Sequence, residues 1–127
     1  MTLNISCGSN LIRRKTDARF NSYLKQLPMT HRTPIVFGDT GNKNWAGVCN
    51  KYKAAKYREI VISEKYWKKM TNNQRLELLA HELGHCDYDL DHNTLRLNLC
   101  PASIMYPKVF GGSCFTDNFN EYMKLFN

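Results

Sequence analysis

The sequence lacks any apolar run that approaches the roughly 20 residues of a membrane-spanning helix. Its first 20 residues contain no apolar h-region, and their basic cluster follows the short apolar patch instead of preceding it. Internal repeats and low-complexity tracts are also missing, which excludes repeat architectures. We therefore expect a soluble, cytoplasmic protein with no signal peptide and no membrane contact.

Cysteine pairs of the CxxC type are missing as well. The five cysteines, an odd number, are Cys7, Cys49, Cys86, Cys100 and Cys114. Their spacing indicates neither a full disulfide framework nor a cysteine zinc site. Free thiols in a reducing compartment are our first interpretation, and one or two disulfides are the alternative.

A chain of 127 residues, 43% of them hydrophobic and 12% aromatic, has the size and composition of one globular domain. Its net charge of +7 is unevenly distributed. Residues 1–70 carry 14 Lys/Arg against 4 Asp/Glu, whereas residues 71–127 carry 4 against 7. Scattered lysines on a solvated surface explain this asymmetry, and attraction to nucleic acid or another anionic partner is the alternative.

The segment HELGHCDYDLDH contains three of the four histidines. Side chains four residues apart lie on one face of a helix, so His81 and His85 can present two imidazole nitrogens to one metal ion. Zinc binds such ligands, and Glu82 is suited to accept a proton from a metal-bound water. A catalytic site needs a third protein ligand, for which His92 is the candidate and Asp91 the alternative.

Periodicity places this pattern on a helix. Thr71 or Asn72 can cap its start, and Gln74 completes a capping-box pattern with Thr71. The stripe expected to face the core consists of Leu76, Leu79, Leu83 and Cys86. At about 100° per residue, both histidines fall on the opposite side of the helix. The acidic segment that follows predicts a helix end near residues 87–89.

Hydrophobic patterns also predict the elements on either side of this helix. An amphipathic pattern predicts a first helix over residues 9–27 and another, at the C-terminus, over residues 116–126. Three short β-branched runs predict strands at residues 34–39, 45–52 and 58–63. The Lys-rich link KYKAAKY between the last two strands suits an exposed turn, and an edge strand beside a cleft can bind an extended peptide.

Two separated motifs resemble the metzincin clan of zinc metallopeptidases, most closely its matrixin-like members. HELGH at residues 81–85 with His92 is similar to the zinc-binding consensus, and SIMYP at residues 103–107 is similar to the Met-turn. The resemblance implies an α+β, zincin-like fold with a small twisted mixed sheet, an N-terminal helix, an active-site helix, the Met-turn and a C-terminal helix. The roles that it implies are zinc ligands at His81, His85 and His92, a general base at Glu82, and a turn methionine at Met105.

The resemblance is incomplete between His85 and His92. The clan pattern HExxHxxGxxH places its third ligand ten residues after the first, a position that Asp91 occupies here, and its glycine position is Tyr88. One extra residue brings His92 into the ligand role, while some clan members use an aspartate there. Without the glycine, the chain has to leave the helix by another turn.

We predict one catalytic domain over residues 1–127, with subdomains of about residues 1–86 and 87–127. Its predicted function is that of a monomeric zinc-dependent endopeptidase, in which Glu82 activates a zinc-bound water against a peptide or protein substrate. One alternative is a protease directed at nucleic-acid-bound proteins, and another is a non-catalytic, zinc-stabilised binding module. Short chains without a leader or propeptide occur in bacteria and their viruses, although the sequence itself does not specify a source.

Overall fold

The computed structural model describes residues 13–126. Its main sheet has three strands in the spatial order β1 (Ile35–Phe37), β3 (Tyr57–Ile62) and β2 (Gly47–Tyr52). β1 runs parallel to β3 and β2 runs antiparallel to it, so the sheet is mixed, and the three predicted strands are confirmed. The Lys-rich link between β2 and β3 forms the exposed 3-10 turn η2 (Lys53–Ala55), and β2 is an edge strand.

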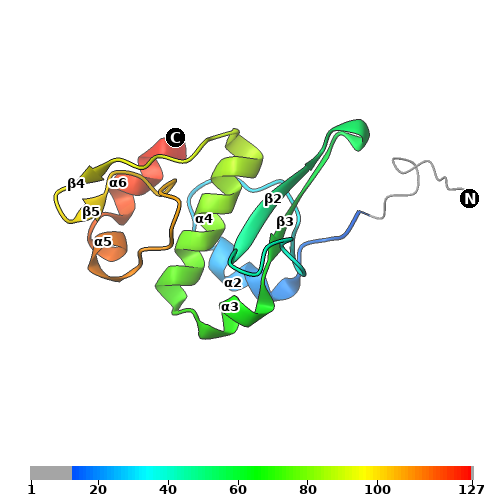
Figure 1. The fold of residues 1–127 in the computed structure, drawn as a ribbon, viewed down its shortest axis with the longest axis horizontal. Helices are drawn as coiled ribbons and strands as arrows, with labels where there is room; N and C mark the ends of the chain where they lie inside the picture. The colour runs from blue at the N-terminus through cyan, green and yellow to red at the C-terminus, as the bar shows by residue number, and fades with distance from the viewer. Residues whose placement is uncertain (1–12, 127) are drawn as a thin grey trace, which may run out of the picture.

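The long helix α4 (Asn72–Tyr88) lies at the centre of the molecule, with the sheet on one side and the C-terminal segments on the other (Figure 1). The Thr71 hydroxyl accepts a hydrogen bond from the Gln74 N–H, and the Gln74 side chain accepts one from the Thr71 N–H. This capping box starts α4 where the sequence predicts it, and α4 ends before Asp89. No helix within residues 13–126 combines the length and hydropathy that a membrane crossing requires.

Both sides of α4 are buried. The predicted core stripe is confirmed, since all of its members are buried: Leu76, Leu79, Leu83 and Cys86. The opposite side is covered too, because Leu78 and Gly84 are also buried there. Burial of α4 therefore extends beyond the predicted stripe, while His81 and His85 line a cleft. The reason is that C-terminal residues such as Met105 pack against α4 from the other direction.

The N-terminal helix is much shorter than the sequence predicts. Residues 13–17 are not helical, and only η1 (Ala18–Phe20) and α2 (Asn21–Leu24) are. The predicted helix over residues 9–27 is therefore wrong for most of its described part, while its first four residues lie outside the described range. Apolar spacing alone did not reveal that this segment has hydrogen-bond partners elsewhere in the fold.

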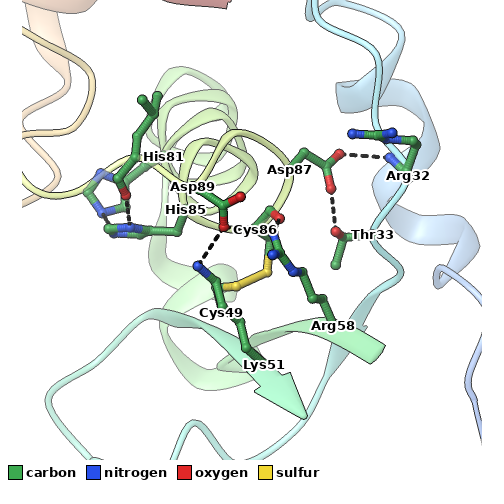
Figure 2. Close-up of a disulfide and its surroundings, with 11 residues drawn as sticks. Arg32, Thr33, Cys49, Lys51, Arg58, His81, His85, Cys86, Asp87 and Asp89 are labelled. Carbon is green, nitrogen blue, oxygen red and sulfur yellow. Dashed lines mark hydrogen bonds and ion pairs between the residues drawn. A yellow bond between two sulfur atoms is a disulfide. The ribbon is translucent and has the colours of Figure 1, made fainter. Parts of the chain in front are cut away.

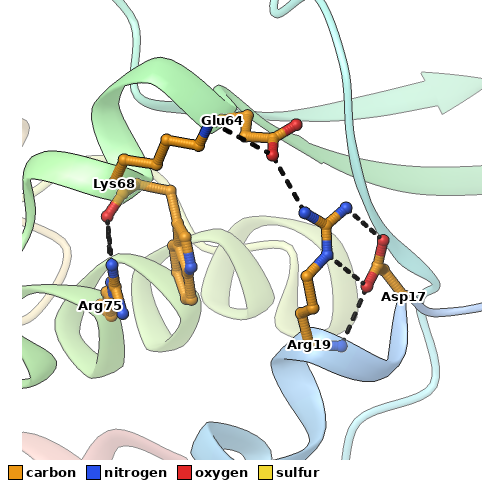
Figure 3. A network of polar contacts seen from close by, with 6 residues as sticks. Asp17, Arg19, Glu64, Lys68 and Arg75 are labelled. Carbon is orange, nitrogen blue, oxygen red and sulfur yellow. Dashed lines mark hydrogen bonds and ion pairs between the residues drawn. The ribbon is translucent and has the colours of Figure 1, made fainter.

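Those partners are on the sheet. Asp17 donates its backbone N–H to the Ile35 carbonyl at 2.9 Å, and the Ile35 N–H donates to the Thr16 hydroxyl at 3.1 Å. Arg19 then lies between the carboxylates of Asp17 and Glu64, at 2.9 and 3.0 Å (Figure 3). Tertiary hydrogen bonds thus replace the helical ones that the amphipathic pattern predicts.

Glu64 opens a further helix, α3 (Glu64–Lys69), that the sequence patterns do not predict. The Ser63 hydroxyl caps it by accepting a hydrogen bond from the Tyr66 N–H. Trp67 of α3 is buried in the core, and its carbonyl accepts two hydrogen bonds from the Arg75 guanidinium of α4. These contacts fix the start of α4 against the rest of the protein.

The C-terminal segment contains a two-stranded sheet and three short helices. In chain order these are β4 (Arg96–Leu97), β5 (Cys100–Pro101), α5 (Gly112–Asp117), α6 (Phe119–Met123) and η3 (Lys124–Phe126). The predicted helix over residues 116–126 is therefore only partly right, because helix begins earlier and is interrupted at Asn118. Gly111 and Gly112 have positive φ values of 53° and 59°, which allow the chain to turn sharply into α5.

Four of the five cysteines form two disulfides, Cys49–Cys86 and Cys100–Cys114. The free-thiol interpretation is wrong for these four, and Cys7 lies outside the described residues. The sequence did not reveal the pairs, because their members are 37 and 14 residues apart and meet only through the fold. The first disulfide joins β2 to the last turn of α4 (Figure 2), and the second joins β5 to α5.

Candidate metal centre

Three histidines converge beside α4 and form what we term the histidine cluster. His81 and His85 lie one helical turn apart, and their Nε2 atoms are 3.1 Å from each other. His92 reaches the same place from the segment after α4, so that one ligand atom from each histidine lies within 4.8 Å of the others. Asp91 is not part of this cluster, and it is exposed.

Backbone carbonyls fix the orientation of two of these rings. His81 Nδ1 lies 2.9 Å from the Ile104 carbonyl oxygen, and His85 Nδ1 lies 2.7 Å from that of Leu90. Because a carbonyl oxygen only accepts, each Nδ1 carries the proton and each Nε2 keeps a free lone pair. Burial lowers the pKa of His81 to about 4 and also lowers the pKa of His85. Neutral imidazoles with converging free nitrogens fit a divalent metal ion.

The chain leaves α4 through Asp89, which makes the turn that the missing glycine would have made. Asp89 has a left-handed φ of 53°, and the Gly84 carbonyl accepts the N–H groups of both Asp89 and Leu90. Lys51 and Arg58 of the sheet hold the Asp89 carboxylate at 3.0 and 2.9 Å (Figure 2). Aspartate tolerates this backbone conformation better than most residues with a side chain. The turn sends the next residues back toward the histidine cluster.

A tight turn at residues 103–106 supports the cluster from the C-terminal side. The Tyr106 N–H donates to the Ser103 carbonyl at 3.1 Å and closes the turn. Met105, inside the turn, is 2% exposed and packs against Gly84 of α4. The preceding residue, Ile104, supplies the carbonyl that binds His81. The position of this turn therefore determines the orientation of one histidine.

Glu82 faces a cleft between α4 and the edge strand β2. The cleft has a volume of about 380 Å³, and the histidine cluster forms part of its lining. Glu82 is 5% exposed, and a Cβ added at Gly47 would lie 3.2 Å from its Oε2, so the carboxyl group is beside β2. Burial raises the pKa of Glu82 to about 8, with no offsetting partner among the described residues. Such a carboxyl group can both accept and release a proton near neutral pH.

Residues 14–102, which include the histidine cluster and Glu82, match the family described as "Putative phage metallopeptidase". The chain belongs to this family. No curated protein and no solved structure matches the chain. Membership of the phage metallopeptidase family indicates a metal-dependent peptidase, and the histidine cluster is a group of residues in which a metal ion fits.

The cleft contains a second buried carboxyl group, Glu77, that the sequence patterns did not assign to the site. Glu77 lies one turn before His81 and lines the same cleft. The N–H groups of Phe110 and Gly111 donate to its two oxygens, both at 2.6 Å. Burial raises the pKa of Glu77 to about 7, although the two hydrogen bonds lower it. Glu77 thereby fixes the segment that carries Val109 into the cleft wall. Its only sequence signal is an acidic residue within the apolar part of a helix.

Proposed function

We propose that this chain is a zinc-dependent endopeptidase of the matrixin-like metzincin type. The observation that carries the proposal is the convergence of three imidazole groups beside a buried carboxyl group in one cleft. Family membership supports a metal-dependent peptidase. Three protein ligands with room for water or substrate at a fourth position are the usual arrangement of catalytic zinc, which supports this choice of metal.

His81, His85 and His92 would hold the zinc ion, which supplies a Lewis acid for the scissile carbonyl and makes a water molecule more acidic. Glu82 takes a proton from the attacking water and returns it to the leaving amine. Its buried position beside β2 keeps the carboxyl group close to the substrate-binding edge. The carbonyl groups that bind Nδ1 of His81 and His85 keep both rings in the tautomer whose Nε2 is free.

We assign the third ligand role to His92 and not to Asp91, since His92 belongs to the histidine cluster and Asp91 does not. The metzincin assignment has separate support. Met105 is buried in a tight turn directly after Ile104, which contacts His81, and this is the relationship that the Met-turn resemblance implies.

The substrate that we propose is an extended peptide segment. β2 is hydrogen-bonded to β3 on one side only, and residues of β2 line the cleft. A peptide that adds to this edge by main-chain hydrogen bonds would cross the cleft beside Glu82. Trp45, which is 48% exposed and lines the same cleft, offers an aromatic surface for a substrate side chain.

Replacement of Glu82 tests the proposal. Glu82→Gln keeps the shape of the side chain and removes the base, so we expect full zinc content and a loss of peptide cleavage of about 100-fold or more. Zinc is measured by elemental analysis, and cleavage by mass spectrometry of a mixed peptide library. Glu121→Gln, at an exposed position of α6, is the matched control and should leave both quantities unchanged. Peptide cleavage by Glu82→Gln at the wild-type rate would overturn the mechanism.

The non-catalytic module predicts a different result. A structural zinc site is usually closed by a fourth protein ligand and needs no base. Within residues 13–126, the histidine cluster contains three candidate ligands and no fourth. A zinc-loaded wild-type protein that cleaves no member of the library would favour the binding module over the peptidase.

A further inference from the structure

The turn between β2 and β3 carries a cluster of cations and tyrosines. We call it the hairpin tip, and its members are Lys51, Tyr52, Lys53, Lys56, Tyr57 and Arg58. The two strands extend away from the rest of the molecule and end in this turn (Figure 1). Together the six residues line a shallow surface pocket of about 290 Å³. No carboxylate is among the residues that line this pocket.

The charge at the hairpin tip is only partly neutralised. Asp89 forms ion pairs with both Lys51 and Arg58. All 11 Asp and Glu residues of the protein lie within residues 13–126, and none of them forms an ion pair with Lys53 or Lys56 there. Both lysines are exposed. They are available to an anionic partner from outside the chain.

The aromatic groups of the hairpin tip are stacked. The Arg13 guanidinium carbon lies 4.9 Å from the centre of the Tyr57 ring, and Arg13 also donates to the Ala55 carbonyl at 2.9 Å. The rings of Tyr57 and Tyr52 are 5.9 Å apart between centres and only 16° from parallel. Tyr57 is buried, whereas Tyr52 is 39% exposed. This arrangement holds Tyr52 in place with part of its ring accessible.

We propose that the hairpin tip binds single-stranded nucleic acid, with Lys53 and Lys56 at the phosphates and Tyr52 stacked on a base. A cationic surface alone would accept any polyanion, but a fixed and accessible aromatic ring favours a partner whose planar groups can stack on it. Nucleic acid combines both features, because each base is next to a phosphate. Polyphosphate and anionic lipid provide the charge and no planar group.

The hairpin tip adjoins the metal cleft. Lys51 lines both the tip pocket and the cleft that contains the histidine cluster, and β2 runs from one to the other. A strand bound at the tip would therefore lie at one end of the peptide-binding edge. If the proposed peptidase function holds, its preferred substrates are proteins associated with nucleic acid. Binding itself does not depend on that function.

Fluorescence anisotropy with a labelled oligothymidylate of about 12 nucleotides tests the proposal on the full-length protein. Lys53→Gln/Lys56→Gln should weaken binding by about tenfold and reduce the slope of log affinity against log salt by about 1.4, since two phosphate contacts are lost. The control Lys65→Gln/Lys69→Gln removes the same charge from exposed positions of α3 and should change affinity by less than about twofold.

Substitution of Tyr52 distinguishes binding of nucleic acid from binding of other polyanions. Tyr52→Leu should weaken oligothymidylate binding by about tenfold and leave binding of polyphosphate unchanged, whereas Tyr52→Trp should keep or increase oligothymidylate affinity. Unchanged binding in Tyr52→Leu, or equal weakening by the α3 control, would overturn the proposal. Glu82→Gln should bind the oligonucleotide like wild type, so loss of peptidase activity and loss of this site are distinguishable.

Discussion

The Met105 sulfur packs so closely on Gly84 that a Cβ at position 84 would lie 2.5 Å from it. Gly84 directly precedes His85 in α4, and Met105 directly follows Ile104, whose carbonyl binds His81. The absence of a side chain at Gly84 therefore sets the distance between α4 and the turn at residues 103–106. The position of His85 on α4 and the contact of His81 with the turn therefore both depend on this packing.

Gly84→Ala should consequently have opposite effects on the free energy of unfolding in the wild-type protein and in the Met105→Ala variant. In the wild-type protein the added methyl group collides with buried Met105, which we expect to lower the free energy of unfolding by about 1–2 kcal/mol and to weaken zinc binding. With Met105→Ala in place, the collision is removed and the better helix propensity of alanine should raise the free energy of unfolding by up to about 1 kcal/mol. Urea denaturation and zinc titration of the four proteins measure both effects. If Gly84→Ala changed the free energy of unfolding in the same direction in both proteins, the collision with Met105 would be contradicted.

The choice of third ligand gives a second prediction. His92→Ala should lower zinc affinity by more than about 100-fold, beyond the loss typical of residues that only orient a ligand. Asp91→Ala, at the neighbouring exposed position, should change zinc affinity by a few-fold at most. Competition with a chromogenic chelator measures both constants. A larger loss of zinc affinity in Asp91→Ala than in His92→Ala would mean that Asp91, and not His92, is the third ligand.

Local patterns predicted the central part of this protein well. The capping box at Thr71, the apolar stripe of α4 and the i,i+4 spacing of His81 and His85 all depend on residues near one another in the chain. Short-range rules of helix geometry are sufficient for such features. The three strands were recognised for the same reason, since their β-branched runs are contiguous.

Features that depend on distant residues were missed. Residues 13–17 do not continue a helix because Thr16 and Asp17 hydrogen-bond to β1, and no apolar spacing encodes that choice. The pairing of Cys49 with Cys86 is likewise a consequence of the fold. The sequence did not predict how the chain turns at Asp89, because the two basic residues that bind the Asp89 carboxylate come from the sheet. Tertiary contacts outweigh local preference at each of these places.

The two disulfides should differ in what they contribute. Chain-entropy reasoning predicts that loss of Cys49–Cys86, with a separation of 37 residues, costs about 4 kcal/mol, and that loss of Cys100–Cys114, with 14, costs about 3 kcal/mol. Only the first joins the cleft strand β2 to α4, so Cys49→Ala/Cys86→Ala should also reduce peptide cleavage more than Cys100→Ala/Cys114→Ala. Urea denaturation and the library assay measure the two effects. Equal stability of oxidised and fully reduced wild-type protein would show that the disulfides contribute nothing.

Glu77 should make stability depend on pH. Burial raises its pKa to about 7 in the folded protein, against 4.5 for the ordinary carboxyl group. The unfolded chain therefore loses this proton first as the pH rises, and the contribution of protonated Glu77 is complete below pH 4.5 and lost as the pH passes through 7. The loss amounts to at most about 3 kcal/mol, from 1.36 kcal/mol per pKa unit.

Glu77→Gln removes this titration while one of its two backbone hydrogen bonds can persist through the amide oxygen. We expect the free energy of unfolding of the wild type, relative to Glu77→Gln, to decrease as the pH is raised from 4.5 to 7. The histidines titrate in both proteins, so the difference between the two denaturation series isolates Glu77. Glu121→Gln, at an exposed position, should run parallel to the wild type. A wild-type advantage that grows with pH would mean that the hydrogen bonds from Phe110 and Gly111 outweigh burial and keep Glu77 ionised.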